Sequence, residues 1–314
     1  MQIVDFKRDH MEEAMKIARM NYEEERQQVK TLPNIDILPD LYHFTDNNLG
    51  VAAFEGNKMV GFMGCYSPID NAWGTTYVKG TFSPIHAHGA IDEKRDKIYS
   101  LLYQAAANKW VKEGIVSHAI GLYAHDTKTL NNFFYNGFGL RCIDAIRPLD
   151  DIPLMEGTKC EYTELKKDEF NKLHIHQNAL ISHLGSSPIF MTYPPKSEEE
   201  FLGGITESTR FFAAKVNGES IAYIKIDLEG ENFACEDTSM MNICGAYCLP
   251  EHRGNGISNN LLSFLVSSLK LEGFSRLGVD FESFNPTARG FWLKYFTPYT
   301  NSVVRRIDEK SVKG

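Results

Sequence analysis

A strand, a glycine-bearing turn and a helix follow one another within residues 242–272, and this order constrains the chain most. Small and apolar residues occupy both faces of 242–249, as in a strand that is buried on both sides. Pro250 ends the predicted strand, because proline has no N–H to give to a neighbouring strand. The turn 253–258 follows, and a helix over 256–272 is predicted from apolar residues at helical spacing, namely Ile257, Leu261, Leu262, Leu265, Val266 and Leu269.

This turn has the composition of an anion-binding site. The first turn of a helix leaves several N–H groups unpaired and carries partial positive charge. Gly254 and Gly256 have no Cβ, so an anion can approach the backbone closely. Arg253 adds a permanent charge and a planar fork of donors that suits phosphate. The alternative is a plain glycine-containing turn with an exposed arginine, but the strand, proline and helix around it favour a phosphate site.

The turn resembles the acetyl-CoA signature of the GCN5-related N-acetyltransferase (GNAT) family, Arg/Gln-x-x-Gly-x-Gly/Ala. Arg253, Gly256 and Ser258 occupy the signature positions, although the family usually has Gly or Ala where Ser258 stands. A second block, 285–294, is similar to the family's Asn-x-x-Ala-x-x-Phe-Tyr-x-Lys helix. The resemblance is firm over about residues 210–307 and weaker elsewhere.

The second block departs from the family pattern at two positions. Trp292 stands where the family often has a tyrosine, and Phe296 stands where a glycine usually ends the helix. An indole cannot donate a proton to a leaving thiolate as a phenol would. The departure at Trp292 therefore supports a second class of function, a CoA-binding sensor or regulatory protein with little or no transferase activity.

The resemblance implies that the chain uses acetyl-CoA as a co-substrate. Backbone groups near Cys248 would meet the thioester, the amides of 254–258 would hold the pyrophosphate, and Asn285 would reach the pantetheine. The full set of candidate acetyl-CoA-binding residues is Tyr247, Cys248, Leu249, Arg253, Gly254, Asn255, Gly256, Ile257, Ser258, Asn285 and Phe291. No metal site is expected, because His86 and His88 have no nearby set of carboxylates or cysteines.

Candidate catalytic residues follow from what acetyl transfer to an amine needs: a base for the amine and a donor for the thiolate. Glu282 is the candidate base, with Asp280 on the same face of the predicted strand as its alternative. The alternative is that one of these carboxylates caps the next helix or pairs with Arg276 or Arg289. Tyr295 is the candidate acid, since it is the phenol nearest to Trp292. Cys248 is not expected to form a covalent intermediate, because direct transfer is the family's rule.

The chain repeats one order of predicted elements, β-α-α-β-β-β-α-β-α-β, so the fold class predicted is α/β, with two tandem GNAT-like three-layer sandwiches and mixed, splayed sheets. Residues 1–148 form a degenerate copy, 149–160 a linker, and 161–314 the acetyl-CoA-binding copy. Asp126 corresponds to Asn285. The first copy has no Arg-x-x-Gly-x-Gly turn, and acidic residues such as Asp92 replace it, so that copy is expected to bind no acetyl-CoA.

Composition limits the class of partner. A net charge of −8 argues against nucleic acid or an anionic membrane and favours a cationic amine acceptor. The sequence has no apolar run of about 18 residues and no apolar signal core at its start, so a cytoplasmic protein is expected. Six cysteines without a CxxC pair are expected to be reduced. Whether the protein forms a homodimer is left open by the sequence.

These observations predict an N-acetyltransferase that moves an acetyl group directly from acetyl-CoA to an amine of a small molecule or peptide. The residues before the second hairpin, 175–193, would form the acceptor wall, as such helices usually do in the family. That wall would include His176, His183, Phe190, Met191 and Tyr193. The sequence leaves the identity of the acceptor open.

Overall fold

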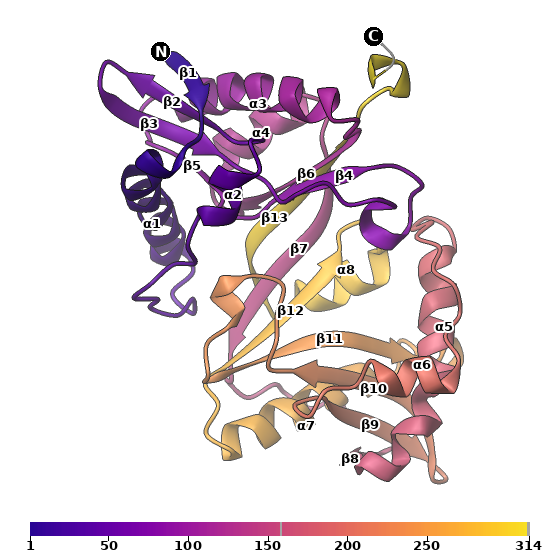
Figure 1. Ribbon diagram of the computed structural model, residues 1–314. Coiled ribbons are helices and arrows are strands. Elements are labelled where there is room, and N and C mark those ends of the chain that lie inside the picture. The colour runs from indigo at the N-terminus through magenta and orange to yellow at the C-terminus, as the bar shows by residue number, and fades with distance from the viewer. Residues whose placement is uncertain (158, 313–314) are drawn as a thin grey trace. The chain divides into compact units, whose positions relative to one another are not determined.

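The structure, a computed structural model, describes residues 1–157 and 159–312, which fall into two compact units (Figure 1). The first unit contains residues 1–144 together with the segment from Pro298 onward, and the second contains residues 145–297. Within the described chain, no helix is long and apolar enough to cross a membrane.

The first unit is a three-layer arrangement in which helices cover both faces of a sheet. Its antiparallel strands run in the order β1-β2-β3-β5, and Gly61 on β3 faces Ile98 of α3, whereas Gly89 on β5 faces Ile17 of α1. Because neighbouring strand residues point to opposite faces, α1 and α3 lie on opposite sides. The elements are β1 Gln2–Asp5, η1 Arg8–His10, α1 Met11–Gln28, α2 Tyr42–Asp46, β2 Val51–Glu55, β3 Lys58–Met63, η2 Ala72–Gly74, β4 Gly80–Ser83, β5 His88–Ala90, α3 Arg95–Lys112, β6 Ser117–Tyr123, α4 Thr127–Tyr135 and β7 Gly139–Pro148, whose last residues belong to the second unit.

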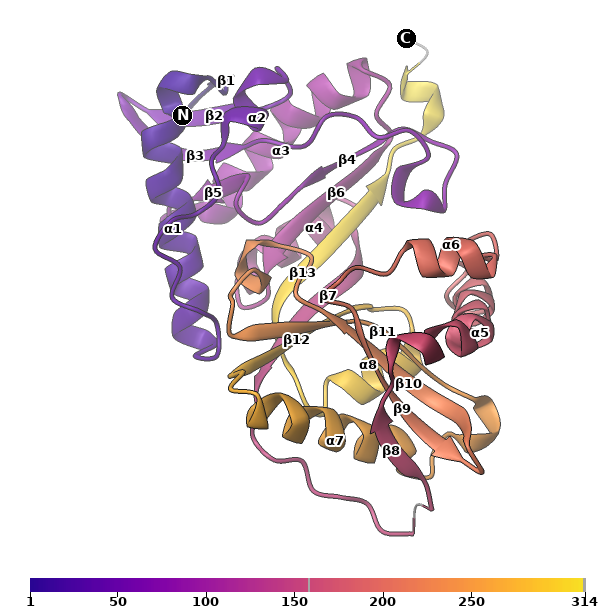
Figure 2. The ribbon, with the colours of Figure 1, turned by 60° about the horizontal axis from the view of Figure 1, so that its bottom comes forward.

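The second unit repeats this order of elements. Its strands lie in the order β12-β11-β10-β9-β8, with α7 along β8–β10 (Figure 2). The elements are β8 Glu161–Glu164, η3 Lys167–Leu173, α5 His174–Gly185, α6 Glu198–Gly203, β9 Arg210–Val216, β10 Glu219–Asp227, η4 Phe233–Cys235, β11 Met240–Cys248, η5 Pro250–His252, α7 Ile257–Leu271, β12 Arg276–Glu282 and α8 Pro286–Trp292. The predicted α/β fold class with mixed sheets is confirmed.

A splay between two parallel strands opens the sheet of the second unit. β11 and β12 pair only from Met240↔Arg276 to Ile243↔Val279, although β11 continues to Cys248. The first unit has the matching parallel pair, from Gly80↔Ser117 to Ser83↔Ile120 between β4 and β6. There the strand is interrupted at Pro84 and resumes as β5, which pairs with β3 instead. The segment that precedes α3 in the first unit therefore contains a short strand, which the sequence analysis did not predict.

The last strand lies in a different unit from the one that its sequence position suggests. β13 (Thr297–Arg306) pairs antiparallel with β6, from Thr300↔Tyr123 to Arg306↔Ser117, and is followed by η6 (Glu309–Val312). The predicted second domain, 161–314, included this strand, whereas the compact first unit contains it. Strand periodicity specifies which residues face the core but not which neighbour the strand joins, so the sequence could not place β13.

Candidate active site

A cavity of about 540 Å³ opens in the second unit where β11 leaves β12. Its wall is formed by β10, the end of β11, the turn before α7, and the residues of α8, with α5 at one side. The residues on the wall are Met155, Leu180, His183, Ala222, Tyr223, Ile224, Ala246, Tyr247, Cys248, His252, Arg253, Gly254, Gly256, Ile257, Ser258, Asn259, Leu261, Asn285, Thr287, Ala288, Gly290, Phe291, Trp292, Lys294 and Tyr295.

The turn before α7 presents backbone amides to this cavity. Gly254 and Gly256 have φ values of 79° and 76°, a left-handed conformation that glycine adopts without strain. Within the described chain, the amides of residues 254–258 donate to no backbone carbonyl, and the first bond that closes the helix runs from Asn260 N to Gly256 O at 3.0 Å. Free N–H groups at a helix start are suited to a pyrophosphate.

Arg253 is held at the end of β11. Its Nε donates to the carbonyl of Cys248 at 2.9 Å, and its guanidinium carbon lies 5.2 Å from the ring centre of Tyr247. No ion pair joins Arg253 to an acidic residue of the described chain. Its terminal nitrogens can therefore meet an anion at the turn.

The end of β11 supplies two backbone amides to the splay. Leu249, the residue directly after β11, donates from N to Ile221 O at 3.0 Å, so at this end of the strand the residues that bond to β10 are Leu249 and Tyr247. Antiparallel bonding alternates along a strand, which turns the amides of Cys248 and Ala246 towards the open side. These two amides can donate hydrogen bonds to a thioester carbonyl that enters the splay. Burial raises the pKa of the Cys248 thiol, so this group is a poor nucleophile.

The start of α8 is organised by Asn285. Asn285 is buried and caps the helix, since its Oδ1 accepts from Ala288 N at 3.3 Å and from Thr287 Oγ1 at 2.7 Å. The Nε2 atom of His183, from α5, lies 3.4 Å from Thr287 Oγ1. An α5 histidine is thereby brought to the same part of the cavity wall as the cap of α8.

The aromatic residues that follow this cap, Trp292 and Tyr295, make different contacts. Trp292 is buried and packs edge-on against Phe296, with ring centres 5.6 Å apart. Both departures from the family pattern therefore contribute to the core. The Tyr295 hydroxyl donates to Oδ1 of Asn259, and burial raises the pKa of this phenol.

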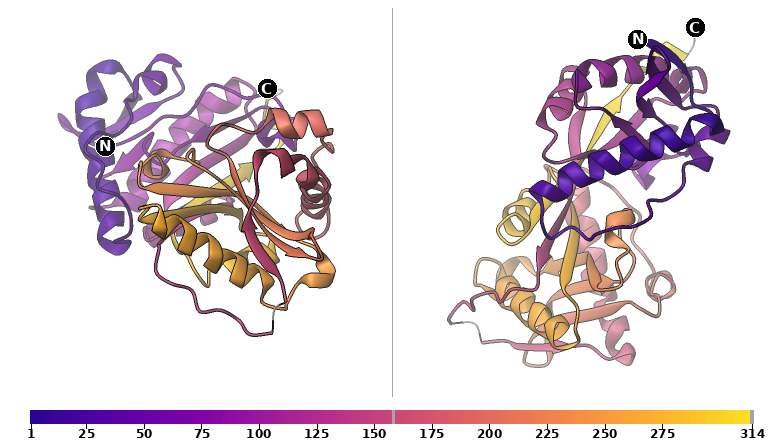
Figure 3. Two further views of the ribbon diagram at one scale, coloured as in Figure 1. Left: turned by 90° about the horizontal axis from the view of Figure 1, so that it is seen from below. Right: turned by 90° about the vertical axis from the view of Figure 1, so that its left-hand side faces the viewer.

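The linker forms part of the same site, which the sequence did not predict. Asn260 donates from Nδ2 to Met155 O at 2.9 Å and accepts from Met155 N at 2.8 Å. Asn259 Nδ2 donates to Pro153 O at 2.9 Å, and Ser263 Oγ donates to Ile152 O at 2.8 Å. The chain thus runs along α7 before it reaches β8 (Figure 3) and places Met155 against Gly256.

The structure brings most of the predicted residues together at the cavity. Tyr247, Cys248, Arg253, Gly254, Gly256, Ile257, Ser258, Asn285, Phe291 and Tyr295 are on its wall, whereas Leu249, Asn255 and Glu282 are not. Among the residues that the structure describes, the wall contains no carboxylate at all. Asp280 and Glu282 are half-buried on one face of β12, and the roles assigned to them stay predictions.

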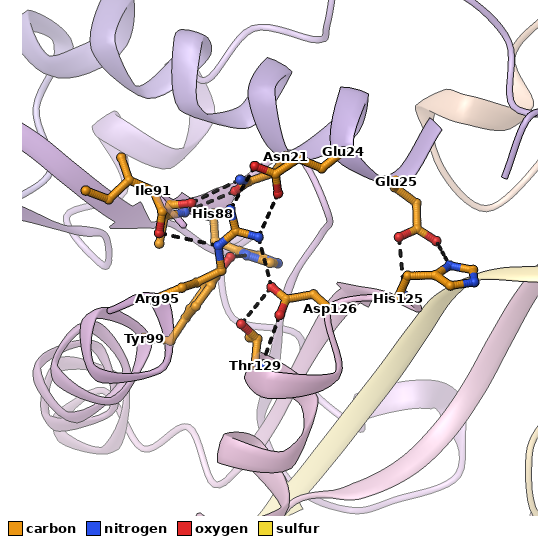
Figure 4. A network of polar contacts seen from close by, with 11 residues as sticks. Asn21, Glu24, Glu25, His88, Ile91, Arg95, Tyr99, His125, Asp126 and Thr129 are labelled. Carbon is orange, nitrogen blue, oxygen red and sulfur yellow. Dashed lines mark hydrogen bonds and ion pairs between the residues drawn. The ribbon is translucent and has the colours of Figure 1, made fainter. Parts of the chain in front are cut away.

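The first unit has an ion-pair network where the second has its amide turn (Figure 4). Arg95, the first residue of α3, pairs through Nη1 with Glu24 of α1 at 2.7 Å and with Asp126 at 3.4 Å. Asp126 caps α4 by accepting from Thr129 N at 3.1 Å, as Asn285 caps α8. Beside it, Glu25 Oε1 lies 2.7 Å from Nδ1 of His125. Two carboxylates, both paired with Arg95, thus lie at the start of α3.

Comparisons with known proteins agree with this geometry. Residues 178–296, all in the second unit, match the family model described as the acetyltransferase (GNAT) family. This segment is therefore a GNAT domain. No curated protein matches the sequence. The described chain also contains no group of three or more His, Cys, Asp or Glu side chains that could hold a metal ion.

Two solved structures share the fold over nearly the whole chain. A GCN5-related N-acetyltransferase from Sphaerobacter thermophilus is 9% identical with a TM-score of 0.60, over 97% of this chain and 95% of that one. A glucosamine N-acetyltransferase region of a fungal multi-domain β-N-acetylglucosaminidase is 15% identical with a TM-score of 0.52, over 98% of this chain and 38% of that one. At these identities the likeness is one of fold.

Proposed function

We propose that this protein is an N-acetyltransferase that moves an acetyl group directly from acetyl-CoA to an amine of a small molecule or peptide. The observation that carries the proposal is one cavity that joins the free amides of 254–258 to the splay beside Cys248. The match of residues 178–296 to the acetyltransferase family supports acetyl transfer as the chemistry.

The pyrophosphate, pantetheine and thioester of acetyl-CoA have complementary groups on the wall. The pyrophosphate is held by the amides of 254–258 and by Arg253. The pantetheine extends between β11 and Asn285 into the splay, where the amides of Ala246 and Cys248 polarise the thioester carbonyl. The amine nitrogen then attacks that carbonyl carbon, the C–S bond breaks, and the thiolate of CoA leaves. Tyr295 is the proposed donor to the thiolate, on the wall of the same cavity.

A second candidate is a CoA-binding sensor with little or no transferase activity. The observation that favours it is Trp292, a buried indole that stands where the family resemblance places a tyrosine and that has no hydroxyl to offer a thiolate. A sensor would bind acetyl-CoA at the same turn but would release no thiol in the presence of amines.

A measurement of turnover distinguishes the acetyltransferase from the CoA-binding sensor. The protein is incubated with acetyl-CoA and a panel of amines that includes a polyamine, an aminoglycoside, a hexosamine and a basic peptide, and free thiol and acetylated amine are measured. We expect transfer to a cationic member of the panel, because the net charge of −8 attracts cations. Tight binding of acetyl-CoA without transfer to any amine would establish the sensor instead.

A further inference from the structure

The cavity wall contains few groups that could take a proton from an amine. Its titratable side chains, among the described residues, are Tyr223, Tyr247, Cys248, His183, His252, Arg253, Lys294 and Tyr295. Arginine and the lysine ammonium offer no lone pair and cannot accept a proton. The base, if it stands on this wall, is one of the phenols, the thiol or a histidine.

The phenols and the thiol are unsuited to the role. Burial raises the pKa of Tyr223, whose hydroxyl donates to Gln177 Oε1 at 3.0 Å. Burial likewise raises the pKa values of Cys248 and Tyr295, and the Tyr295 proton is directed at Asn259. Tyr247 lies against the Arg253 guanidinium. A group that keeps its proton at neutral pH is an acid rather than a base.

The two histidines stand at different places on the wall. His252 directly precedes Arg253, at the phosphate turn. His183 comes from α5 and approaches the cap of α8, with Nε2 3.4 Å from Thr287 Oγ1. The Thr287 hydroxyl hydrogen is used in the bond to Asn285, so Thr287 Oγ1 is the acceptor in this contact. A neutral imidazole that donates from Nε2 keeps a lone pair on Nδ1.

We propose that His183 is the general base of the acetyl transfer, an inference that rests on the proposed function. Nδ1 of His183 accepts the proton that the amine nitrogen loses as it bonds to the thioester carbon. The electron pair of the broken C–S bond leaves on the thiolate of CoA, which is then protonated by Tyr295 or by solvent.

The test is the pH dependence of steady-state transfer in His183→Gln. We expect kcat to fall by about 10²–10⁴-fold, the usual contribution of a general base, and the acidic limb of the profile to disappear. The dissociation constant of acetyl-CoA, measured by calorimetry, should stay within about twofold, which also shows that the variant is folded. In His183→Ala, added imidazole should restore part of the rate.

Two further variants make the result specific. His174→Gln carries the same change on the same helix, but His174 bonds to Lys196 O and is not on the cavity wall, so its rate and profile should match the native protein. In Glu282→Gln the acidic limb should remain. A His183→Gln variant with native kcat and a native acidic limb overturns the inference, and so does loss of the limb in Glu282→Gln alone. A native protein that acetylates no amine overturns the proposed function itself, and this inference with it.

Discussion

Gly254 and Gly256 meet different requirements within one turn. Both have φ values near 78°, but a Cβ at Gly254 would contact nothing within 4 Å, whereas one at Gly256 would lie 2.7 Å from Met155 Cβ. Gly254 is therefore needed for its backbone conformation alone, and Gly256 also for the close approach of the linker. Because Asn and Asp tolerate the left-handed conformation best after glycine, position 254 can be substituted without disrupting the fold.

Gly254→Asp should weaken acetyl-CoA binding by about tenfold or more relative to Gly254→Asn. The two side chains have nearly the same shape, and only the aspartate repels the pyrophosphate, at a cost of about 1 kcal/mol per pair of charges 4 Å apart in water. The measurement is the dissociation constant by calorimetry. Equal affinities in the two variants would show that the pyrophosphate does not bind at this turn.

Buried histidines make the first unit sensitive to acid. Burial lowers the pKa values of His86, His88 and His118 from 6.5 to about 4. His88 is neutral between Tyr99, which lies 2.8 Å from Nδ1, and the Gly121 carbonyl, 2.6 Å from Nε2. The unfolded chain takes up protons at these residues below pH 6.5, while the folded chain does so only near pH 4.

The contribution of these histidines to the free energy of unfolding should therefore have its full value above pH 6.5 and should decrease as the pH falls towards 4. Each histidine contributes up to about 3 kcal/mol of this loss. Urea unfolding, followed at intervals between pH 7.5 and 4.5, measures it. A free energy of unfolding that stays constant over this interval would contradict the buried, neutral state of these side chains.

At the scale of elements, the linker is a structural part of the second unit and not a free tether. Both polar groups of the Asn260 side chain bond to the backbone of Met155, and Asn260, Asn259 and Ser263 are all buried under this segment. The hydrogen bond from Tyr295 to Asn259 extends the contact to the cavity. The linker, α7 and the residues after α8 thus support the phosphate turn together.

Asn260→Ala should lower the free energy of unfolding by about 1–3 kcal/mol, because it leaves the N–H and C=O of Met155 without their partner. The released linker should also be cut faster by trypsin after Lys159. Ser268→Ala is the control, since Ser268 bonds only within α7, to Phe264 O, and does not touch the linker. Equal proteolysis of Asn260→Ala and the control would show that the linker is held by other contacts.

The sequence predicted the strand, turn and helix of the site better than it predicted which distant segments pack against them. The strand, turn and helix of 240–271 were predictable because periodicity, proline and glycine act locally. His183 was expected on the acceptor wall from the family resemblance, whereas Met155 was not predicted, because no local pattern indicates which distant segment packs against the turn. The strand β13 shows the same limit, since its alternation of side chains fits either sheet. Glu282 was predicted from strand alternation alone, which gives the face of a strand but not the boundary of a cavity.

At the scale of the whole molecule, two copies of one fold carry different groups at equivalent places. The parallel pairs β4–β6 and β11–β12 begin at Gly80 and Met240, and the caps Asp126 and Asn285 follow at similar intervals. In the second unit the helix start offers free amides, whereas in the first it is occupied by the Arg95 network. Among the described residues, the start of α7 therefore has the features proposed for an acetyl-CoA site, and the start of α3 does not.

One acetyl-CoA should accordingly bind per chain. The network of Arg95, Glu24 and Asp126 occupies the start of α3, so the first unit should contribute no site. Calorimetric titration gives the stoichiometry, and binding at the single site should be about tenfold or more weaker in Gly254→Asp than in Gly254→Asn. A stoichiometry near two would show that the first unit also binds the ligand.

The most direct test of acetyl transfer is a product balance with the native protein. Purified protein is incubated with acetyl-CoA and the amine that gives most turnover, and free CoA thiol and N-acetylated amine are quantified in the same samples, with Gly254→Asp and Gly254→Asn in parallel. We predict equal amounts of the two products, formed by the native protein and by Gly254→Asn, and strongly reduced in Gly254→Asp at limiting acetyl-CoA. Release of thiol without acetylated amine, or no release with any amine, would contradict the account.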